Sequence, residues 1–388
     1  MAMEGPRSGL ALIISNFIFF LLSGSARTGT ASNATIGINY GQIADNLPSP
    51  QRVAGLLRSI NIIKKVKLYD ANREVLEAFA NTGIEFVVGL SNEYVGNMTD
   101  QAAAVDWVKE NVQGYLPGTN ITCIAVGNEV FTSNNTLWMS NLVPAMQNIH
   151  SALVSLGLQD SVNVTTAHSS FVLATSYPPS AGAFKPELTA FLRPLLDFLS
   201  QTTSPFLINA YPYFAYKDNA DQIPLDYVLF QPNAGTVDPG TNLHYSNMLH
   251  AQIDAVYSAL SALGYSAMEI KVSETGWPSK GDSDEVGATP ENARIYNGNL
   301  LQLLAQNQGT PMRPSVRLES YVFALFNEDQ KPGKTSERNY GLFKSDGSPA
   351  YDVGLHGSLS GASANPILYS KVVVSSLCSL FLLFFLGL

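Results

Sequence analysis

Residues 36–355 alternate between short β-like runs and amphipathic helix-like segments, and this alternation limits the chain to few folds. Apolar residues in the helix-like segments recur at spacings of three and four, as at Val53, Leu56, Leu57 and Ile60. Strands are expected at residues 36–40, 65–69, 85–90, 122–126, 163–167, 206–210, 269–273 and 321–326. Helices are expected at residues 49–60, 73–81, 100–113, 137–156, 188–200, 245–263 and 290–306. Eight strand–helix repeats predict an α/β fold, the (β/α)8 TIM barrel, with a doubly wound open sheet as the main alternative.

The composition of residues 36–355 favours a single domain. This length suits one large barrel or two smaller domains, but no long linker, charge block or short-period repeat interrupts it. The first expected strand is followed by a polar loop at residues 40–48, where a dinucleotide-binding fold would place a glycine-rich phosphate loop. A net charge of −9 disfavours nucleic acid as a partner and suits a neutral substrate.

The start of the chain predicts export. Arg7 precedes an apolar run at residues 10–22, and small residues follow it, which is the pattern of a secretory signal peptide at residues 1–26. Cleavage is expected after Ala26, with a site near Ala31 or Ser32 as the alternative. Five asparagines stand two residues before a threonine and are candidate glycosylation sites: Asn33, Asn97, Asn120, Asn134 and Asn163.

The end of the chain predicts a lipid anchor. Residues 372–388 are apolar, and a cluster of small residues lies upstream at 358–364. This layout is typical of a glycosylphosphatidylinositol attachment signal, in which residues 356–363 form a short linker and residues 364–388 are removed. Candidate attachment residues are Ser360, Gly361 and Ser363. A tail-anchored helix is the alternative interpretation.

Cysteine usage agrees with a large hydrophobic core. Of the two cysteines, Cys378 lies in the tail that is expected to be removed, so the mature chain would contain no intramolecular disulfide. Cys123 lies in an expected apolar strand and is interpreted as a buried, inert thiol.

Two of the expected strands, the fourth and the seventh, are followed directly by a glutamate, at Glu129 and Glu274. The carboxyl ends of barrel strands open on one face, so side chains that are distant in sequence can converge there. Hydrolysis of a glycosidic bond requires one carboxylic acid that protonates the leaving oxygen and one carboxylate that attacks or activates water. Two ordinary loop glutamates are the alternative interpretation.

The residues around both glutamates are specific enough to suggest a family. Ala125-Val126-Gly127-Asn128-Glu129-Val130 and Val272-Ser273-Glu274-Thr275-Gly276-Trp277-Pro278-Ser279 resemble the signature strands of plant family 17 glycoside hydrolases, the endo-β-1,3-glucanases. The resemblance also covers residues 36–41, 66–70, 208–214, 326–333 and 339–343. It implies that Glu129 is the general acid and base, and that Glu274 is the nucleophile of a retaining double displacement. Retention predicts carboxyl groups roughly 5 to 5.5 Å apart, and the charge of Glu274 is expected to raise the pKa of Glu129.

Further residues are expected to bind substrate. Aromatic side chains near the ends of strands can stack on sugar rings or donate hydrogen bonds to hydroxyl groups, and the candidates are Tyr40, Tyr69, Tyr211 and Phe214. Core packing is the alternative for these rings. Asn128 is a candidate for binding the sugar 2-hydroxyl. Glu328 and Lys331 resemble an additional active-site pair of the family, in which the lysine keeps Glu274 charged and Glu328 holds the lysine or a sugar hydroxyl; a surface ion pair is the alternative.

No metal site or cofactor is inferred. His150, His168, His244 and His250 are not matched by clustered acidic or cysteine ligands. His168 follows the fifth expected strand at the active face, where packing or hydrogen bonding is the favoured role over contact with substrate.

The two ends of the chain and the resemblance together predict a secreted, lipid-anchored endo-β-1,3-glucanase at the outer face of a plant plasma membrane and in the cell wall, acting on callose-like glucan. Its expected partners are β-1,3-glucan and, through the anchor, the membrane, and the chain is expected to be a monomer. Two alternatives stay open. The glycosyl-enzyme could pass its sugar to another sugar, which would make the protein a transglycosylase, or the protein could bind glucan without catalysis.

Overall fold

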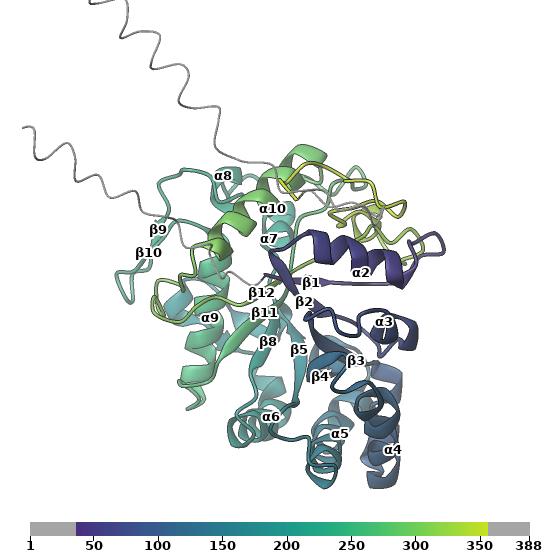
Figure 1. Ribbon diagram of the computed structural model, residues 1–388. Coiled ribbons are helices and arrows are strands. Elements are labelled where there is room, and N and C mark those ends of the chain that lie inside the picture. The colour runs from purple at the N-terminus through teal and green to yellow at the C-terminus, as the bar shows by residue number, and fades with distance from the viewer. Residues whose placement is uncertain (1–35, 356–388) are drawn as a thin grey trace, which may run out of the picture. The chain divides into compact units, whose positions relative to one another are not determined.

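Eight parallel strands close into a barrel in the computed structural model, which describes residues 36–355 (Figure 1). Around the barrel the strand order is β1-β12-β11-β8-β5-β4-β3-β2. The strands are β1 Ile36–Asn39, β2 Ile63–Lys67, β3 Glu85–Leu90, β4 Asn120–Asn128, β5 Asn163–Ser169, β8 Phe206–Asn209, β11 Ile270–Thr275 and β12 Ser320–Val322. All eight strands expected from the sequence are present, with ends shifted by a few residues, so the predicted TIM barrel is confirmed.

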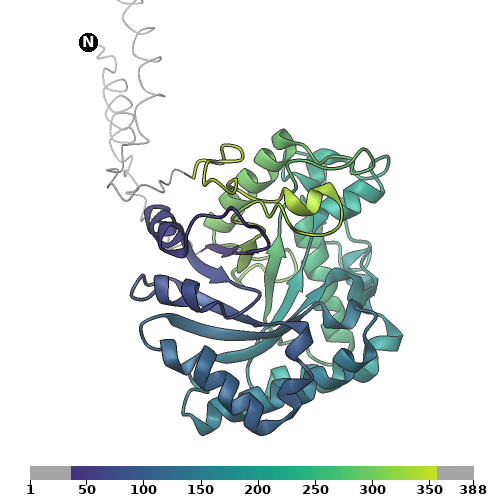
Figure 2. The same cartoon turned by 90° about the vertical axis from the view of Figure 1, so that its right-hand side faces the viewer.

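Helices cover the outside of the barrel, as the two views in Figures 1 and 2 show. They are α2 Pro50–Ser59, α3 Arg73–Ala78, α4 Gln101–Asn111, α5 Thr136–Ser155, α6 Thr189–Gln201, α7 Pro212–Asp218, α8 Leu225–Val228, α9 Met248–Ala262 and α10 Pro290–Ala305. Side-chain oxygens cap the amino ends of several of them, for example Asn72 at α3, Asp100 at α4 and Asn135 at α5. The short helices α7 and α8 were not predicted.

Irregular elements decorate the loops. Two small antiparallel sheets pair β6 Leu173–Thr175 with β7 Ala183–Phe184, and β9 Thr236–Val237 with β10 His244–Tyr245. Short 3₁₀ turns are η1 Asn92–Tyr94, η2 Asn97–Thr99, η3 Gln113–Tyr115, η4 Val130–Thr132, η5 Ser170–Val172, η6 Pro179–Ala181, η7 Pro186–Leu188 and η8 Thr335–Arg338. The sequence did not predict the small sheets, because strands of two or three residues are too short to show a period.

The hydrophobic core lies between the barrel and its helices. In β3, Phe86, Val88 and Leu90 on one face and Val87 on the other are buried, as expected for a parallel strand that is covered on both faces. Cys123 is buried, as predicted, and burial raises the pKa of its thiol to about 12, which disfavours the reactive thiolate. Within residues 36–355, no helix combines the length and the apolar character needed to cross a bilayer.

Four of the five candidate glycosylation asparagines lie in the described part of the chain. Asn97, Asn120, Asn134 and Asn163 are all exposed, so each is accessible to modification. Asn33, the signal peptide and the segments assigned to the lipid anchor lie outside the described residues.

Candidate active site

A cleft of about 940 Å³ lies at the carboxyl-terminal ends of the barrel strands. This volume is at the upper end of the roughly 300 to 1,000 Å³ of small-ligand sites, and it suits several sugar units better than one. Every catalytic or substrate-binding residue expected from the sequence lines the cleft: Tyr40, Tyr69, Asn128, Glu129, Tyr211, Phe214, Glu274, Glu328 and Lys331.

The backbone at the end of β4 adopts a left-handed conformation twice. Gly127 has φ +67°, and a Cβ atom there would lie 2.6 Å from Val130 and 2.9 Å from Asn92. Glu129 has φ 53° and ψ 31°, a conformation that is unfavourable for a residue with a side chain by about 1–2 kcal/mol. Of the six non-glycine residues with positive φ among residues 36–355, Glu129 is the one that lines the cleft, and strained residues concentrate at functional sites.

Two neighbouring segments hold this strained backbone. The backbone N–H of Asn128 donates to Oδ1 of Asn92 at 2.7 Å, and Nδ2 of Asn92 donates back to the Asn128 carbonyl at 3.0 Å. The N–H of Glu129 donates to the carbonyl of Ala167 in β5 at 2.8 Å. Asn92 therefore clamps the peptide that directly precedes Glu129, and it does so from the loop after β3.

The Glu129 carboxyl group has neutral hydrogen-bonding partners. Its Oε1 accepts a hydrogen bond from Nδ2 of Asn209 at 2.8 Å, and Oδ1 of Asn209 accepts one from the Ser273 hydroxyl at 2.6 Å. Burial raises the pKa of Glu129, and the nearby charge of Glu274 raises it further, against a smaller lowering effect of the Asn209 hydrogen bond. Glu129 is therefore disposed to hold a proton.

Glu274 has the opposite environment. Nζ of Lys67 lies 2.9 Å from its Oε1, and the Tyr211 hydroxyl donates to its Oε2 at 2.9 Å. The side chains of Lys67 and Glu274 are only 2% and 8% exposed. The buried Tyr69 hydroxyl interacts with the same carboxylate, although it forms no hydrogen bond of good geometry. Burial alone would raise the pKa of Glu274, but the charge and hydrogen bond of Lys67 lower it below the usual value.

The side chains of Glu328 and Lys331 form no ion pair with each other, and Lys331 does not contact Glu274 directly, although the charge of Lys331 is among those that lower the pKa of Glu274, as expected from the sequence. Nζ of Lys331 forms an ion pair with Glu337 at 3.1 Å and lies 4.5 Å from the centre of the Phe323 ring. Oε1 of Glu328 accepts a hydrogen bond from the backbone N–H of Ile43 at 3.0 Å. Lys67, rather than Lys331, is the cation in contact with Glu274. The side chain of Lys67 points from β2 into the barrel interior, where it meets the Glu274 side chain of β11.

Aromatic side chains form one wall of the cleft. The ring of Tyr211 packs against Phe214 at 5.2 Å, Tyr340 at 5.8 Å and Phe323 at 6.1 Å between centroids. Tyr40 differs from this group, because its ring is 2% exposed and packs on Phe326, so core packing describes it best. The wall offers apolar ring faces beside the two carboxyl groups.

Asn128 has an unused acceptor. Its Oδ1 is buried without a hydrogen-bond partner in the described part of the chain. A buried acceptor that lacks a partner is unfavourable by about 1–3 kcal/mol, and Asn128 lines the cleft beside Glu129. The position agrees with the expected contact to a sugar hydroxyl.

His168 is a packing residue. Its ring is buried between Phe131 and Phe206, with centroid distances of 5.4 and 4.6 Å. Burial lowers the pKa of His168 to about 3, so the ring is neutral. Among residues 36–355, no group of three metal-ligating side chains is assembled.

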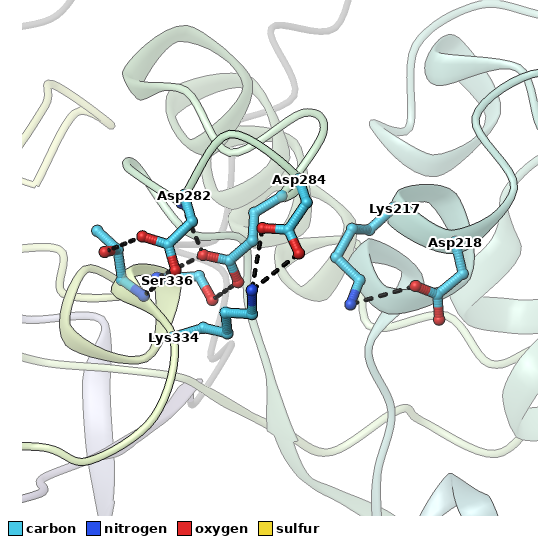
Figure 3. A network of polar contacts seen from close by, with 8 residues as sticks. Lys217, Asp218, Asp282, Asp284, Lys334 and Ser336 are labelled. Carbon is cyan, nitrogen blue, oxygen red and sulfur yellow. Dashed lines mark hydrogen bonds and ion pairs between the residues drawn. The ribbon is translucent and has the colours of Figure 1, made fainter.

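A polar latch joins two loops at the rim of the site (Figure 3). We use this name for the contacts of Asp282, Asp284 and Glu285 with Lys334, Thr335 and Ser336. Lys334 binds both carboxylate oxygens of Asp284 at 3.0 and 2.8 Å, and Glu285 accepts from the backbone and the hydroxyl of Ser336. The separate pair of Lys217 and Asp218 lies nearby on α7. The latch fixes η8, which carries the Glu337 partner of Lys331.

Comparison with known proteins identifies the family of this chain. The family model described as glycosyl hydrolases family 17 matches residues 36–355. The chain belongs to glycosyl hydrolases family 17. It is 57% identical over 350 residues to glucan endo-1,3-beta-glucosidase 11 of Arabidopsis thaliana, covering 89% of this chain and 82% of that protein. It is also 47% identical over 340 residues to glucan endo-1,3-beta-D-glucosidase of Olea europaea, covering 87% and 74%.

Solved structures agree with this assignment. The chain is similar to CJP38, a beta-1,3-glucanase and allergen of Cryptomeria japonica pollen, with a TM-score of 0.79, 43% identity, and coverage of 82% of this chain and 98% of that chain. The family 17 protein is therefore a glycoside hydrolase.

Three polar residues of the family 17 site were missed from the sequence: Lys67, Asn92 and Asn209. Lys67 and Asn209 stand two residues before Tyr69 and Tyr211, and alternate residues of a strand point to the same side. This period of two could have indicated that both face the barrel interior. Asn92 lies in a loop, where no periodic pattern indicates the direction of a side chain.

Proposed function

We propose that this family 17 hydrolase cleaves internal β-1,3-glucosidic bonds of callose-like wall glucan with retention of anomeric configuration. The observation that carries the proposal is the opposite electrostatic environment of two carboxyl groups in one cleft. Glu129 is disposed to be protonated and Glu274 to be ionised. This division is the one that a glycosidase with an acid and a nucleophile requires.

In the first step, an oxygen of Glu274 attacks the anomeric carbon of the sugar. The bond from that carbon to the leaving oxygen breaks, and the leaving oxygen takes the proton of Glu129. The product is a glycosyl ester on Glu274 and a shortened glucan with a free hydroxyl. Tyr211 and Lys67 orient the attacking carboxylate, which leaves Oε2 and Oε1 in defined positions.

In the second step, the Glu129 carboxylate removes a proton from water, and the water oxygen attacks the same carbon. The ester bond breaks, and Glu274 leaves as a carboxylate that Lys67 again neutralises. Retention predicts a short separation of the two carboxyl groups, roughly 5 to 5.5 Å. Glu129 and Glu274 line the same cleft, which is compatible with such a separation.

The substrate assignment rests on the relatives and on the aromatic wall of the cleft. The relatives carry the names glucan endo-1,3-beta-glucosidase and beta-1,3-glucanase. A cleft of about 940 Å³ has room for glucan units on both sides of the scissile bond, which favours internal cleavage.

We also propose attachment to the outer face of the plasma membrane and contact with the cell wall. The apolar run at residues 10–22 and the small-residue and apolar segments at 358–364 and 372–388 support this location. Treatment of intact cells with a phospholipase C specific for the lipid anchor should release the protein. Retention on the treated membranes would contradict a lipid anchor.

Product analysis on laminari-oligosaccharides tests the proposed reaction. We expect new reducing ends, with the first product formed as the β-anomer in a proton NMR time course. An α-anomer as first product would contradict retention, and products longer than the substrate would indicate transglycosylation. Glucan binding without new reducing ends would indicate a non-catalytic protein.

A further inference from the structure

Phe171 is an exposed aromatic residue inside the cleft. It lies in η5, directly after β5, and its residue surface is 60% exposed. It lines the same cleft as Glu129 and Glu274. None of the ring contacts observed among residues 36–355 involves Phe171, and most of its surface is open to the cleft.

Backbone hydrogen bonds hold the segment that carries the Phe171 ring. The N–H of Phe171 donates to the Ser169 hydroxyl at 3.3 Å, and the carbonyl of Val172 accepts from Lys185 at 2.9 Å. The strands that follow η5, β6 and β7, pair with each other. Because hydrogen bonds hold the backbone at Phe171 and at Val172, this segment can hold the Phe171 ring at the edge of the cleft in a defined orientation.

The strand order places Phe171 far from the first loop of the barrel. In the ring of eight strands, β5 stands opposite β1. Ile43, which follows β1 and also lines the cleft, is 49% exposed. Glu129 follows β4 and Glu274 lies in β11, so the cleft extends across the barrel from the β1 loop to the β5 loop, past the carboxyl groups.

We propose that Phe171 is the stacking platform of a glucosyl subsite at the β5 end of the cleft. This inference rests on the proposed function, because its ligand is a sugar unit of the β-1,3-glucan chain. The apolar face of a glucosyl ring covers the phenyl ring and removes both surfaces from water. Lys185 and Glu187 line the cleft on the same side and offer polar groups to the sugar hydroxyls. Only a glucan chain that is long enough to reach Phe171 gains binding free energy from this contact.

The dependence of kcat/KM on chain length tests the platform. For Phe171→Ala, we expect the ratio of kcat/KM for a long laminari-oligosaccharide to that for a short one to fall by about threefold to tenfold, the size of one aromatic contact. Phe171→Trp retains a ring and should keep the ratio. The matched control is Tyr177→Ala, which removes a 69% exposed ring that does not line the cleft and should leave the ratio unchanged.

An unchanged ratio in Phe171→Ala, or an equal fall in Tyr177→Ala, would overturn the subsite. A loss of the same factor for every chain length would also overturn it, since such a loss indicates a general defect. Thermal unfolding of each variant identifies a folding defect separately.

Binding to an inactive background separates this inference from the proposed reaction. In Glu274→Gln, titration calorimetry with a long laminari-oligosaccharide should show an affinity about threefold to tenfold weaker after Phe171→Ala. If the wild-type protein releases no reducing ends but this loss of affinity is found, the proposed hydrolysis fails and the subsite stands. If the affinity is unchanged, the subsite fails whatever the activity.

Discussion

Buried charges are paired differently at the two ends of the barrel interior, and β2 contributes one lysine to each end. Lys65 and Lys67 are two residues apart in β2, so their side chains point the same way. Toward the amino-terminal end, Lys65 binds Glu319 at 2.9 Å and Glu85 at 3.2 Å. Toward the carboxyl-terminal end, Lys67 binds Glu274 at 2.9 Å.

The amino-terminal network is balanced and partly hydrated. Lys65 and Lys271 both bind Glu319, and their side chains are 14% and 22% exposed. Burial alone would raise the pKa of Glu319, but the two lysines lower it, so the carboxylate is ionised with cations on both sides. A network of this kind contributes modestly to the free energy of unfolding.

The ion pair of the carboxyl-terminal site is more deeply buried, and the site has more carboxyl groups than cations in contact with them. Lys67 neutralises Glu274, whereas Glu129 and Glu328 have only neutral hydrogen-bond donors, and burial raises the pKa of both. Burial is the largest cause of the raised pKa of Glu129, and the charge of Glu274 raises it further, whereas Lys271 and Lys65 lower the pKa of Glu319 despite its burial. The two ends therefore differ in the supply of cations beside each buried carboxyl group. Substitutions at the two ends can test this difference.

Glu274→Gln should abolish hydrolysis, with a fall in kcat of about 10⁴-fold or more, because an amide cannot attack the anomeric carbon. The release of reducing ends from β-1,3-glucan measures this loss. Glu319→Gln is the matched substitution at the other end of the barrel and should retain the activity. Residual activity near that of the wild type would show that Glu274 is not the nucleophile.

Lys67→Met should reduce activity by about 10²-fold at neutral pH and reduce the free energy of unfolding by about 3–5 kcal/mol, because Glu274 loses its partner in a buried site. The wild-type pKa of Glu274 is lowered, so its stabilising ion pair is complete above the unfolded pKa and is lost as the pH falls through the folded pKa. Without Lys67, the pKa rises and the acidic limb of the kcat/KM profile moves to higher pH.

Lys65→Met is the control that sharpens this prediction, because it removes the lysine of the same strand at the other end. We expect its acidic limb to coincide with that of the wild type. A pH–rate profile of each variant measures the acidic limb of kcat/KM. An equal shift of this limb in Lys65→Met and Lys67→Met would contradict the proposed difference between the two ends.

Asn92→Ala should lower kcat by about tenfold with little change in KM, because the clamp on the Asn128 peptide orients Glu129 without touching substrate. Asn92→Asp keeps the acceptor for the Asn128 N–H but loses the donor to its carbonyl, so an intermediate kcat is expected. A change confined to KM in either variant would argue for a direct contact with glucan instead.

Glu319→Gln should have the smallest effect, a loss of about 1 kcal/mol in the free energy of unfolding, because the network is partly exposed. Lys65 keeps Glu85 as its partner, and Lys271 keeps Glu269. Urea denaturation measures the change. A loss as large as that of Lys67→Met would show that the two ends store similar electrostatic energy, contrary to the comparison.

Much of this molecule could be predicted from local patterns. Repeated strand and helix periods are properties of consecutive residues, so the eight strands and the barrel were predictable. Glu129 and Glu274 were predictable as members of one site, because parallel strands bring their carboxyl ends to one face. The short sheets, α7 and α8 were not, because they are too short to show a period.

Partners across the barrel were not predictable in the same way. The sequence by itself determined that Lys65 and Lys67 share a strand face and that two glutamates end strands. Only the tertiary structure decided that Lys67 binds Glu274, that Lys331 binds Glu337, and that Asn92 holds the strained peptide before Glu129. The physical reason is that strand periods are set by bonds between neighbours, whereas the protonation of a buried carboxyl group is set by charges and dipoles that distant segments bring within a few ångströms.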